Sequence, residues 1–137
     1  MAKTPVKLKV DGFVDREVAS VTYAFEQATD KEGQTTGIPR GGKIVLRVKA
    51  LNDGNCELLH WMISKALAKS GKIEFMNTAE AGKKMKDVEF KDAYCVDFIE
   101  HWEDVHGNDT DLGHYEEITL SCRSIVNQSV TFVNQWT

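Results

Sequence analysis

Apolar side chains at every second position run through most of this chain, and one segment with helical spacing interrupts them. In residues 43–49 the alternating positions are Ile44, Leu46 and Val48, and the same alternation returns in residues 118–123. Successive side chains of a strand point to opposite sides, so this period indicates strands with one buried face. A different spacing predicts an amphipathic helix over about residues 55–68, with one apolar stripe made of Leu58, Leu59, Met62, Ile63, Ala66 and Leu67. The fold class that follows is mainly β, a compact barrel or sandwich of antiparallel strands with one α-helix.

The length and composition are those of one globular domain spanning residues 1–137. A net charge of −4 gives no basic field for a phosphate backbone, so nucleic acid is not an expected partner. Three widely spaced cysteines, an odd number without a Cys-x-x-Cys pair, favour a reducing compartment over a disulfide framework. We therefore expect synthesis and assembly in the cytoplasm.

Neither a secretory signal nor a membrane span is expected from the pattern of residues. The first ten residues alternate lysine with apolar residues instead of forming a continuous apolar stretch. No segment approaches the roughly 18 apolar residues that a membrane span needs. If the protein leaves the cell, we expect a route that does not read a cleaved signal.

Turn and cap signals divide the remaining pattern into elements. Asp11-Gly12 predicts a tight hairpin between the first two strands. From Met85 to Trp102 the even positions share an apolar face, and Asp92 interrupts them, which predicts a bulge near that residue. The helix is expected to begin after capping side chains at residues 52–55 and to stop at Gly71 in a left-handed cap.

A polar, glycine-rich stretch over residues 29–42 breaks the alternation and predicts a long loop. Loops of this length in compact domains are usually functional or mobile. The segment 37–43 has glycines and a lysine, but a phosphate-binding loop opens a helix, and here a strand follows. We interpret the stretch as a loop without phosphate chemistry.

Three groups of residues carry side chains suited to chemistry, and none is assigned a catalytic, metal-binding or cofactor-binding role. Cys56 and His60 share one helical face, yet no supporting Asn or Asp completes a catalytic set. His101, His106 and His114 match no closed zinc site, and residues 108–119 fail as a calcium loop. The carboxylates around residues 100–117 fit a solvated rim. The chain is not predicted to be an enzyme, and no cofactor is expected.

Six short segments, taken in order, resemble the Hcp (TssD) tube protein family of type VI secretion systems, in its Bacteroidetes form. In the second half these are residues 71–75 (GKIEF), 85–96 (MKDVEFKDAYCV), 118–123 (ITLSCR) and 134–136 (NQW). In the first half they are residues 40–44 (RGGKI) and 57–62 (ELLHWM). The acidic stretch 104–114 and the cysteines match no role in the family.

The resemblance implies a β-barrel with one helix that assembles as a homo-hexameric ring. It further implies that rings stack into a hollow tube, which a contractile sheath expels with the spike ahead of it and with effectors inside. It implies secretion through the type VI apparatus without a signal peptide. The subunit and ring contacts that we predict are Thr35, Thr36, Gly37, Ile38, Pro39, Arg40 and Gly41 in the long loop and Trp61 on the helix.

Two other functions remain open from the residues. One is a tube subunit of a phage-like contractile tail. The other is a monomeric β-barrel that binds a small ligand. An enzyme that uses Cys56 and His60 or the histidine-containing loop is a further alternative.

Overall fold

The computed structural model describes residues 6–51, 53–76, 83–104, 113–134 and 136. In these ranges the elements are β1 (Val6–Val10), β2 (Arg16–Tyr23), β3 (Lys43–Lys49), α1 (Glu57–Ile63), β4 (Lys69–Met76), β5 (Lys84–Trp102), β6 (His114–Asn127) and β7 (Val130–Val133). The predicted hairpin at Asp11-Gly12 joins β1 to β2, and Gly12 supplies the positive φ of 82° that the turn requires.

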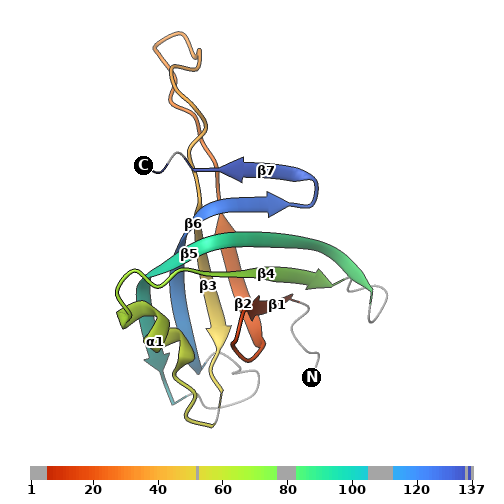
Figure 1. Ribbon diagram of the computed structural model, residues 1–137, viewed down its shortest axis with the longest axis vertical. Coiled ribbons are helices and arrows are strands. Elements are labelled where there is room, and N and C mark those ends of the chain that lie inside the picture. Colours follow the sequence, from red (N-terminus) through yellow and green to blue (C-terminus); the bar gives the residue numbers. More distant parts are fainter. Residues whose placement is uncertain (1–5, 52, 77–82, 105–112, 135, 137) are drawn as a thin grey trace.

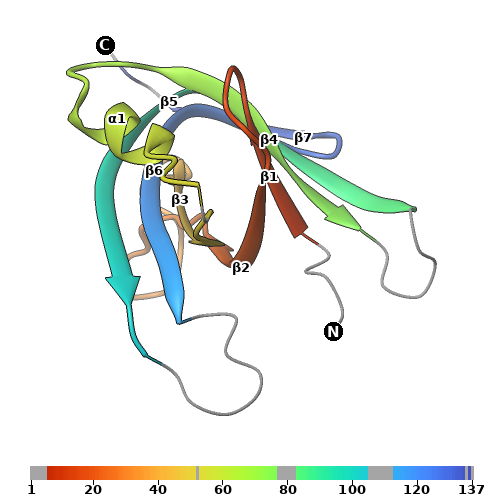
Figure 2. The same ribbon diagram turned by 90° about the horizontal axis from the view of Figure 1, so that it is seen from below.

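The strands pair antiparallel in the order β3-β2-β1-β4-β5-β6-β7. A further pairing between β3 and β6, from Lys43↔Ser121 to Lys49↔Tyr115, joins the two ends of the six-strand series. The sheet therefore closes into a barrel, and β7 extends it from the far end of β6 (Figures 1 and 2). The predicted antiparallel barrel with one helix is confirmed.

The alternating positions fill the barrel as the sequence predicts for β3 and β6. Ile44 faces Leu120 and Leu46 faces Ile118, and all four side chains are fully buried. The neighbouring strands add Leu8, Val18, Ile73, Val88 and Phe90 to the same core. Apolar burial of this kind stabilises a domain by about 1.5–3 kcal/mol for each large side chain.

The residues of β5 that face the core switch from even to odd positions in the middle of the strand. The sequence predicts where the irregularity lies but not which side chains face the core beyond it. Asp92 has a left-handed φ of 50°, at the predicted bulge. Beyond it Ala93 and Cys95 are buried, while Val96 is 45% exposed. The expectation that Tyr94 and Val96 continue the apolar face is therefore wrong, because the left-handed Asp92 turns the next few side chains over. A second irregularity between Cys95 and Asp97 restores the predicted side, and Phe98 packs against the core.

Helix α1 is shorter than the predicted 55–68. The side chains of Asp53 and Asn55 accept hydrogen bonds from the backbone N–H groups of Asn55 and Glu57, each at 3.0 Å. The N-cap residue is Cys56, which makes no side-chain cap bond, so the predicted capping side chains form turns just before the helix. The helix ends at Ile63, since Ser64 is extended and Ala66 has a φ of 56°. The predicted cap at Gly71 is wrong because this residue lies inside β4.

The face that α1 buries also differs from the predicted stripe. Leu58 and Trp61 are 1% exposed, whereas Ile63 is 71% exposed. The indole N–H of Trp61 donates to the Leu67 carbonyl at 2.9 Å, and its ring meets Phe13 edge-on at 5.9 Å. The interpretation of Trp61 as a subunit contact is therefore corrected: the chain folds back beyond the helix and covers it.

A buried ion pair joins β2 to β6 across the intervening strand β3. Arg16 and Glu116 are 3% and 4% exposed, and the guanidinium donates to the carboxylate. The same Arg16 nitrogen donates to the Lys49 carbonyl at 2.9 Å. Removing one partner would leave the other charge buried, which is strongly destabilising.

We expect Trp61→Ala to lower the free energy of unfolding by about 3–5 kcal/mol, because it empties the space under α1. Ile63→Ala on the same helix should change it by less than about 0.5 kcal/mol. Urea unfolding followed by circular dichroism measures both. Equal losses from the two variants would contradict the orientation of the helix.

Candidate assembly surfaces

Residues 24–42 form a long hairpin between β2 and β3 that stands out from the barrel, and we call it the arm (Figure 1). Its two sides are joined by backbone hydrogen bonds: Glu26 and Arg40 exchange a pair at 2.9 and 2.7 Å, and Thr36 N–H donates to the Ala28 carbonyl at 2.8 Å. Two isolated β-bridges follow the same line. The predicted loop is thus an ordered ribbon.

The tip of the arm is fixed by its own residues. The Asp30 carboxylate accepts hydrogen bonds from the backbone N–H groups of Glu32 and Gln34, at 2.9 and 3.0 Å. Asp30 N–H in turn donates to the Gln34 carbonyl at 2.8 Å. Such Asx turns give a short loop a defined shape without core contacts.

The predicted contact residues of the arm occupy two different environments. Residues 35–40 lie on the returning side, all exposed, with Ile38 56% exposed. Gly41 is half-buried at the base, where an added Cβ would lie 2.3 Å from the ring of Phe25. The first group is available to a partner, and Gly41 is a packing position.

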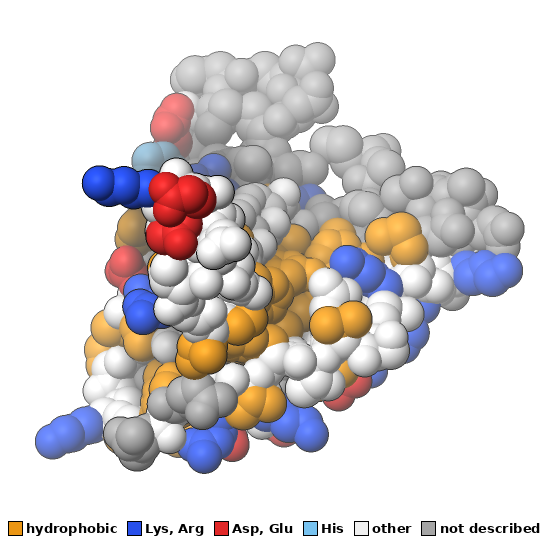
Figure 3. Space-filling view, turned by 90° about the horizontal axis from the view of Figure 1, so that it is seen from above, with side chains coloured by type: hydrophobic (Ala, Val, Ile, Leu, Met, Phe, Trp, Pro, Cys, Tyr) orange, Lys and Arg blue, Asp and Glu red, His pale blue; other side chains and the backbone are white. Residues whose placement is uncertain are grey.

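Aromatic side chains surround the base of the arm. Phe25 packs on Phe132 of β7 with ring centres 4.9 Å apart, and Tyr23 meets Phe25 at 6.1 Å. Seen from above, hydrophobic side chains gather beside the arm (Figure 3). Val130 and Val133 of β7 are 70% and 52% exposed. The end of the subunit that carries the arm therefore has apolar surface.

The outer face of β3, β5 and β6 carries a second exposed set of side chains. Arg47 forms an ion pair with Glu117 at 3.1 Å, and its guanidinium lies 4.4 Å from the centre of the Tyr115 ring. Tyr115 stacks on His101 at 5.1 Å. Ile99, which lies on β5 like His101, is 49% exposed. These contacts hold the polar groups in place around an apolar side chain.

The outer face of β1 and β4 is arranged around one carboxylate. Glu74 lies 3.4 Å from the ammonium of Lys9 and 3.2 Å from that of Lys72. Partial burial opposes ionisation of Glu74, but the hydrogen bonds and charges of the two lysines outweigh it and hold the pKa of this carboxyl below its usual range. The Glu74 carboxylate is thus held in its charged form at the centre of this surface.

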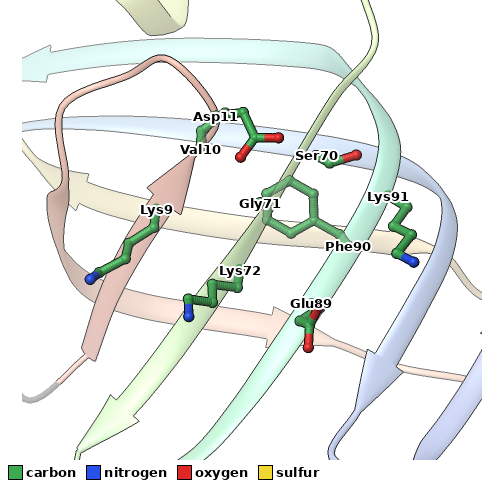
Figure 4. Close-up of a pocket in the computed structure, with 9 residues that line it drawn as sticks. All are labelled: Lys9, Val10, Asp11, Ser70, Gly71, Lys72, Glu89, Phe90 and Lys91. Carbon is green, nitrogen blue, oxygen red and sulfur yellow. The ribbon is translucent and has the colours of Figure 1, made fainter.

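A hollow of about 400 Å³ lies where β1, β4 and β5 adjoin. Figure 4 shows the Phe90 ring at Gly71, with the charged ends of Lys9 and Lys72 directed away from it. An added Cβ at Gly71 would lie 2.2 Å from the Lys9 carbonyl and 2.9 Å from the Phe90 ring. We interpret the hollow as a result of close strand packing at a glycine.

The pair Cys56 and His60 is not assembled for catalysis. The two are joined by a helical backbone hydrogen bond of 3.0 Å, from His60 N–H to the Cys56 carbonyl. The His60 ring instead lies 3.4 Å from the Ser64 hydroxyl, while Cys56 is exposed. Their spacing on the helix follows from the backbone alone.

The histidines are separated into carboxylate pairs. His101 Nε2 lies 3.2 Å from a Glu103 oxygen, and His114 Nε2 lies 2.8 Å from a Glu100 oxygen. His106 falls outside the described residues. In the part of the chain that the structure describes, no three His, Cys, Asp or Glu side chains are grouped to hold a metal ion.

The residues at the arm base, Phe25, Phe132 and Asn134, were not predicted as functional. Asn134 donates to the carbonyls of Cys122 and Gly41, which are 12 and 93 positions away. The only sequence signal is an isolated pair of glycines before a strand, at residues 41 and 42.

No helix among the described residues has the length and apolar character needed to cross a bilayer.

The family model for Hemolysin coregulated protein Hcp (TssD) matches residues 2–137. Hcp1 from Flavobacterium johnsoniae is similar at 29% identity and a TM-score of 0.82, over 94% of this chain and 98% of that chain. Hcp1 from Salmonella typhimurium is similar at 15% identity and a TM-score of 0.66, over 93% and 89%.

A chain of a PVC sheath-tube complex, from an extracellular contractile injection system, has 21% identity and a TM-score of 0.57, over 95% of this chain and 92% of that chain. At these lower identities the likeness concerns the fold. The curated proteins give no match.

Cysteine chemistry provides a test of the barrel interior. Burial raises the pKa of Cys95 to about 11 and that of Cys122 to about 12. At pH 8 both are therefore protonated and covered, and we expect a thiol reagent to modify only Cys56 of the three cysteines. Peptide mass mapping identifies the site.

All three thiols should react in denaturant.

The two raised pKa values also imply that the free energy of unfolding falls as the pH rises from about 9 towards 12, since the thiols of the unfolded chain ionise first. Rapid native modification of Cys95 or Cys122 would contradict the packing of β5 against β6.

Proposed function

The chain belongs to the Hemolysin coregulated protein Hcp (TssD) family, and we propose that six copies of it form a ring. We propose further that the rings stack into the inner tube of a type VI secretion system and that the arm makes the contact between rings. The protein is a structural tube subunit and not an enzyme. Stacked rings form the tube in related contractile systems.

The observation that carries the stacking proposal is the arm itself. Residues 26–40 are all exposed, yet backbone hydrogen bonds and the Asp30 turn hold them in one conformation. Fixing a residue costs about 1–2 kcal/mol of conformational entropy, and these residues recover none of it by entering the core. An ordered, projecting ribbon of this kind is suited to a protein partner.

Self-association is the form of partnership that the rest of the surface favours. Exposed apolar side chains occur along β5 and β7, including Val96, Ile99 and Val130. A ring made by rotation joins two different patches of the same subunit, and stacked rings can continue as a filament. The arm and the apolar end that surrounds it supply one of the two faces for stacking.

The sheath, the spike and secreted effectors are the further partners that we propose for the assembled tube. We propose assembly in the cytoplasm and export through the apparatus itself. A subunit of a phage-like contractile tail remains the second candidate, because a sheath-tube complex is among the similar structures. Both candidates require stacked rings.

A monomeric ligand-binding barrel is disfavoured by the interior. Ile44, Leu46, Ile73, Phe90 and Leu120 fill it and are each fully buried. The described hollows lie on the surface, at about 330–400 Å³. A barrel packed with its own side chains holds no small ligand.

Native mass spectrometry and electron microscopy of the purified protein test the proposal. We expect a species of six times the 15.4 kDa chain mass, and rings that stack at high protein concentration. A strict monomer at every concentration would overturn it.

Ile38→Asp and Arg40→Glu should block stacking while leaving rings and melting temperature unchanged. Both side chains are exposed on the arm, so the changes remove a partner contact and no core contact. We expect the concentration needed for tubes to rise at least about tenfold, which corresponds to about 1.4 kcal/mol per contact. Electron microscopy over a dilution series measures it.

Ile38→Leu and Arg40→Lys are the matched controls, since they keep the apolar character and the charge. Tubes at the wild-type concentration from Ile38→Asp and Arg40→Glu would show that the arm does not join the rings. Gly41 is unsuitable for this test, because a side chain there displaces Phe25.

A further inference from the structure

We propose that Asn134, together with β7, clamps the base of the arm and sets its direction, so that Asn134 is a positioning residue for ring stacking. The inference rests on the proposed function of the arm. It assigns to the C-terminal segment a role in presenting the contact surface, separate from closing the barrel.

The side chain of Asn134 joins three segments of the chain. Its amide nitrogen donates to the Cys122 carbonyl of β6 at 2.8 Å and to the Gly41 carbonyl of the arm at 3.3 Å. Its backbone N–H donates to the Arg123 carbonyl at 2.7 Å. Because both side-chain bonds are donated to carbonyls, the site requires an NH₂ group.

Gly42 makes this junction possible. It is buried, has a φ of +97°, and an added Cβ would lie 2.2 Å from the Asn134 amide nitrogen. Its carbonyl accepts a hydrogen bond of 2.7 Å from Cys122 N–H. The arm therefore enters β3 through a glycine that the C-terminal segment covers directly.

The outgoing side of the arm is held by the same segment. Phe25 packs on Phe132, and its ring occupies the space that a side chain at Gly41 would fill. Beyond Asn134, Trp136 stacks on Tyr94 of β5 with ring centres 5.7 Å apart. The segment that carries Asn134 is thus also anchored to the barrel through β5.

The direction of the arm depends on these contacts because the rest of the arm touches no core. A two-stranded ribbon alone is marginally stable. From Gly42 to Gln34, where the turn at Asp30 closes, the arm extends about 25 Å at the usual rise of a strand, so a tilt of about ten degrees at the base moves the tip by about 4 Å. A displacement of that size separates two contact surfaces.

Asn134→Asp tests the clamp, because it keeps the size of the side chain and replaces the donor with a carboxylate facing two carbonyls. The matched control is Asn55→Asp, which makes the same change in charge where the side chain accepts a hydrogen bond from Glu57 N–H at 3.0 Å. A carboxylate serves equally well there. Hydrogen exchange, native mass and microscopy are measured on all three proteins.

In Asn134→Asp we expect the amides of Glu26 and Arg40 to exchange at least tenfold faster, while amides of β3 and β6 such as Leu46 and Leu120 keep their protection. Rings should persist and tubes should be lost. Asn55→Asp should match the wild type in every measurement. Unchanged exchange in the arm, or tubes at the wild-type concentration, would overturn the clamp.

Equal loss of protection in the arm and in the barrel would also overturn it, because Asn134 would then act on stability in general. If Asn134→Asp does not fold, Asn134→Ser takes its place, since it removes the reach to Gly41 without adding charge. A wild type that forms no rings would defeat the proposed function, while the exchange data would still decide whether Asn134 orders the arm.

Discussion

Closure of the sheet by the pairing of β3 with β6 is the constraint on which the rest of the molecule depends. The seven pairs from Lys43↔Ser121 to Lys49↔Tyr115 bring both strands to one wall and direct their alternate side chains into one interior. Without them β3 would be an open edge and its apolar face would lack a partner. The buried pair of Arg16 and Glu116 spans the same closed barrel from β2 to β6.

Closure also determines where contact surfaces can form. Closure leaves the outer side-chain surfaces, β7 and the arm as surfaces for assembly. The arm leaves the barrel immediately before β3, the strand that completes the closure. The position of the projecting hairpin is therefore tied to the strand pairing that closes the barrel.

The sequence was sufficient where local pattern and tertiary structure agree. In β3, and in β6 from Glu116 to Cys122, every second residue is buried, so the period of two survives there. It failed at residues 93–96 of β5, which follow the left-handed Asp92 with their sides reversed, and at α1, where apolar residues at helical spacing continue past the last helical residue. Trp61 and Asn134 could not be assigned, because their partners are set by the path of distant segments.

The long pairing of β5 with β6 has a mechanical consequence. It runs from Val88↔Asn127 to Trp102↔His114, and β6 also receives the arm base through the Cys122–Gly42 hydrogen bond. A pull on the arm is therefore passed into a strand that is held along its whole length. A ladder loaded along its strands yields only when many hydrogen bonds break together. A subunit built in this way withstands a pull on the arm better than its thermal stability alone would indicate.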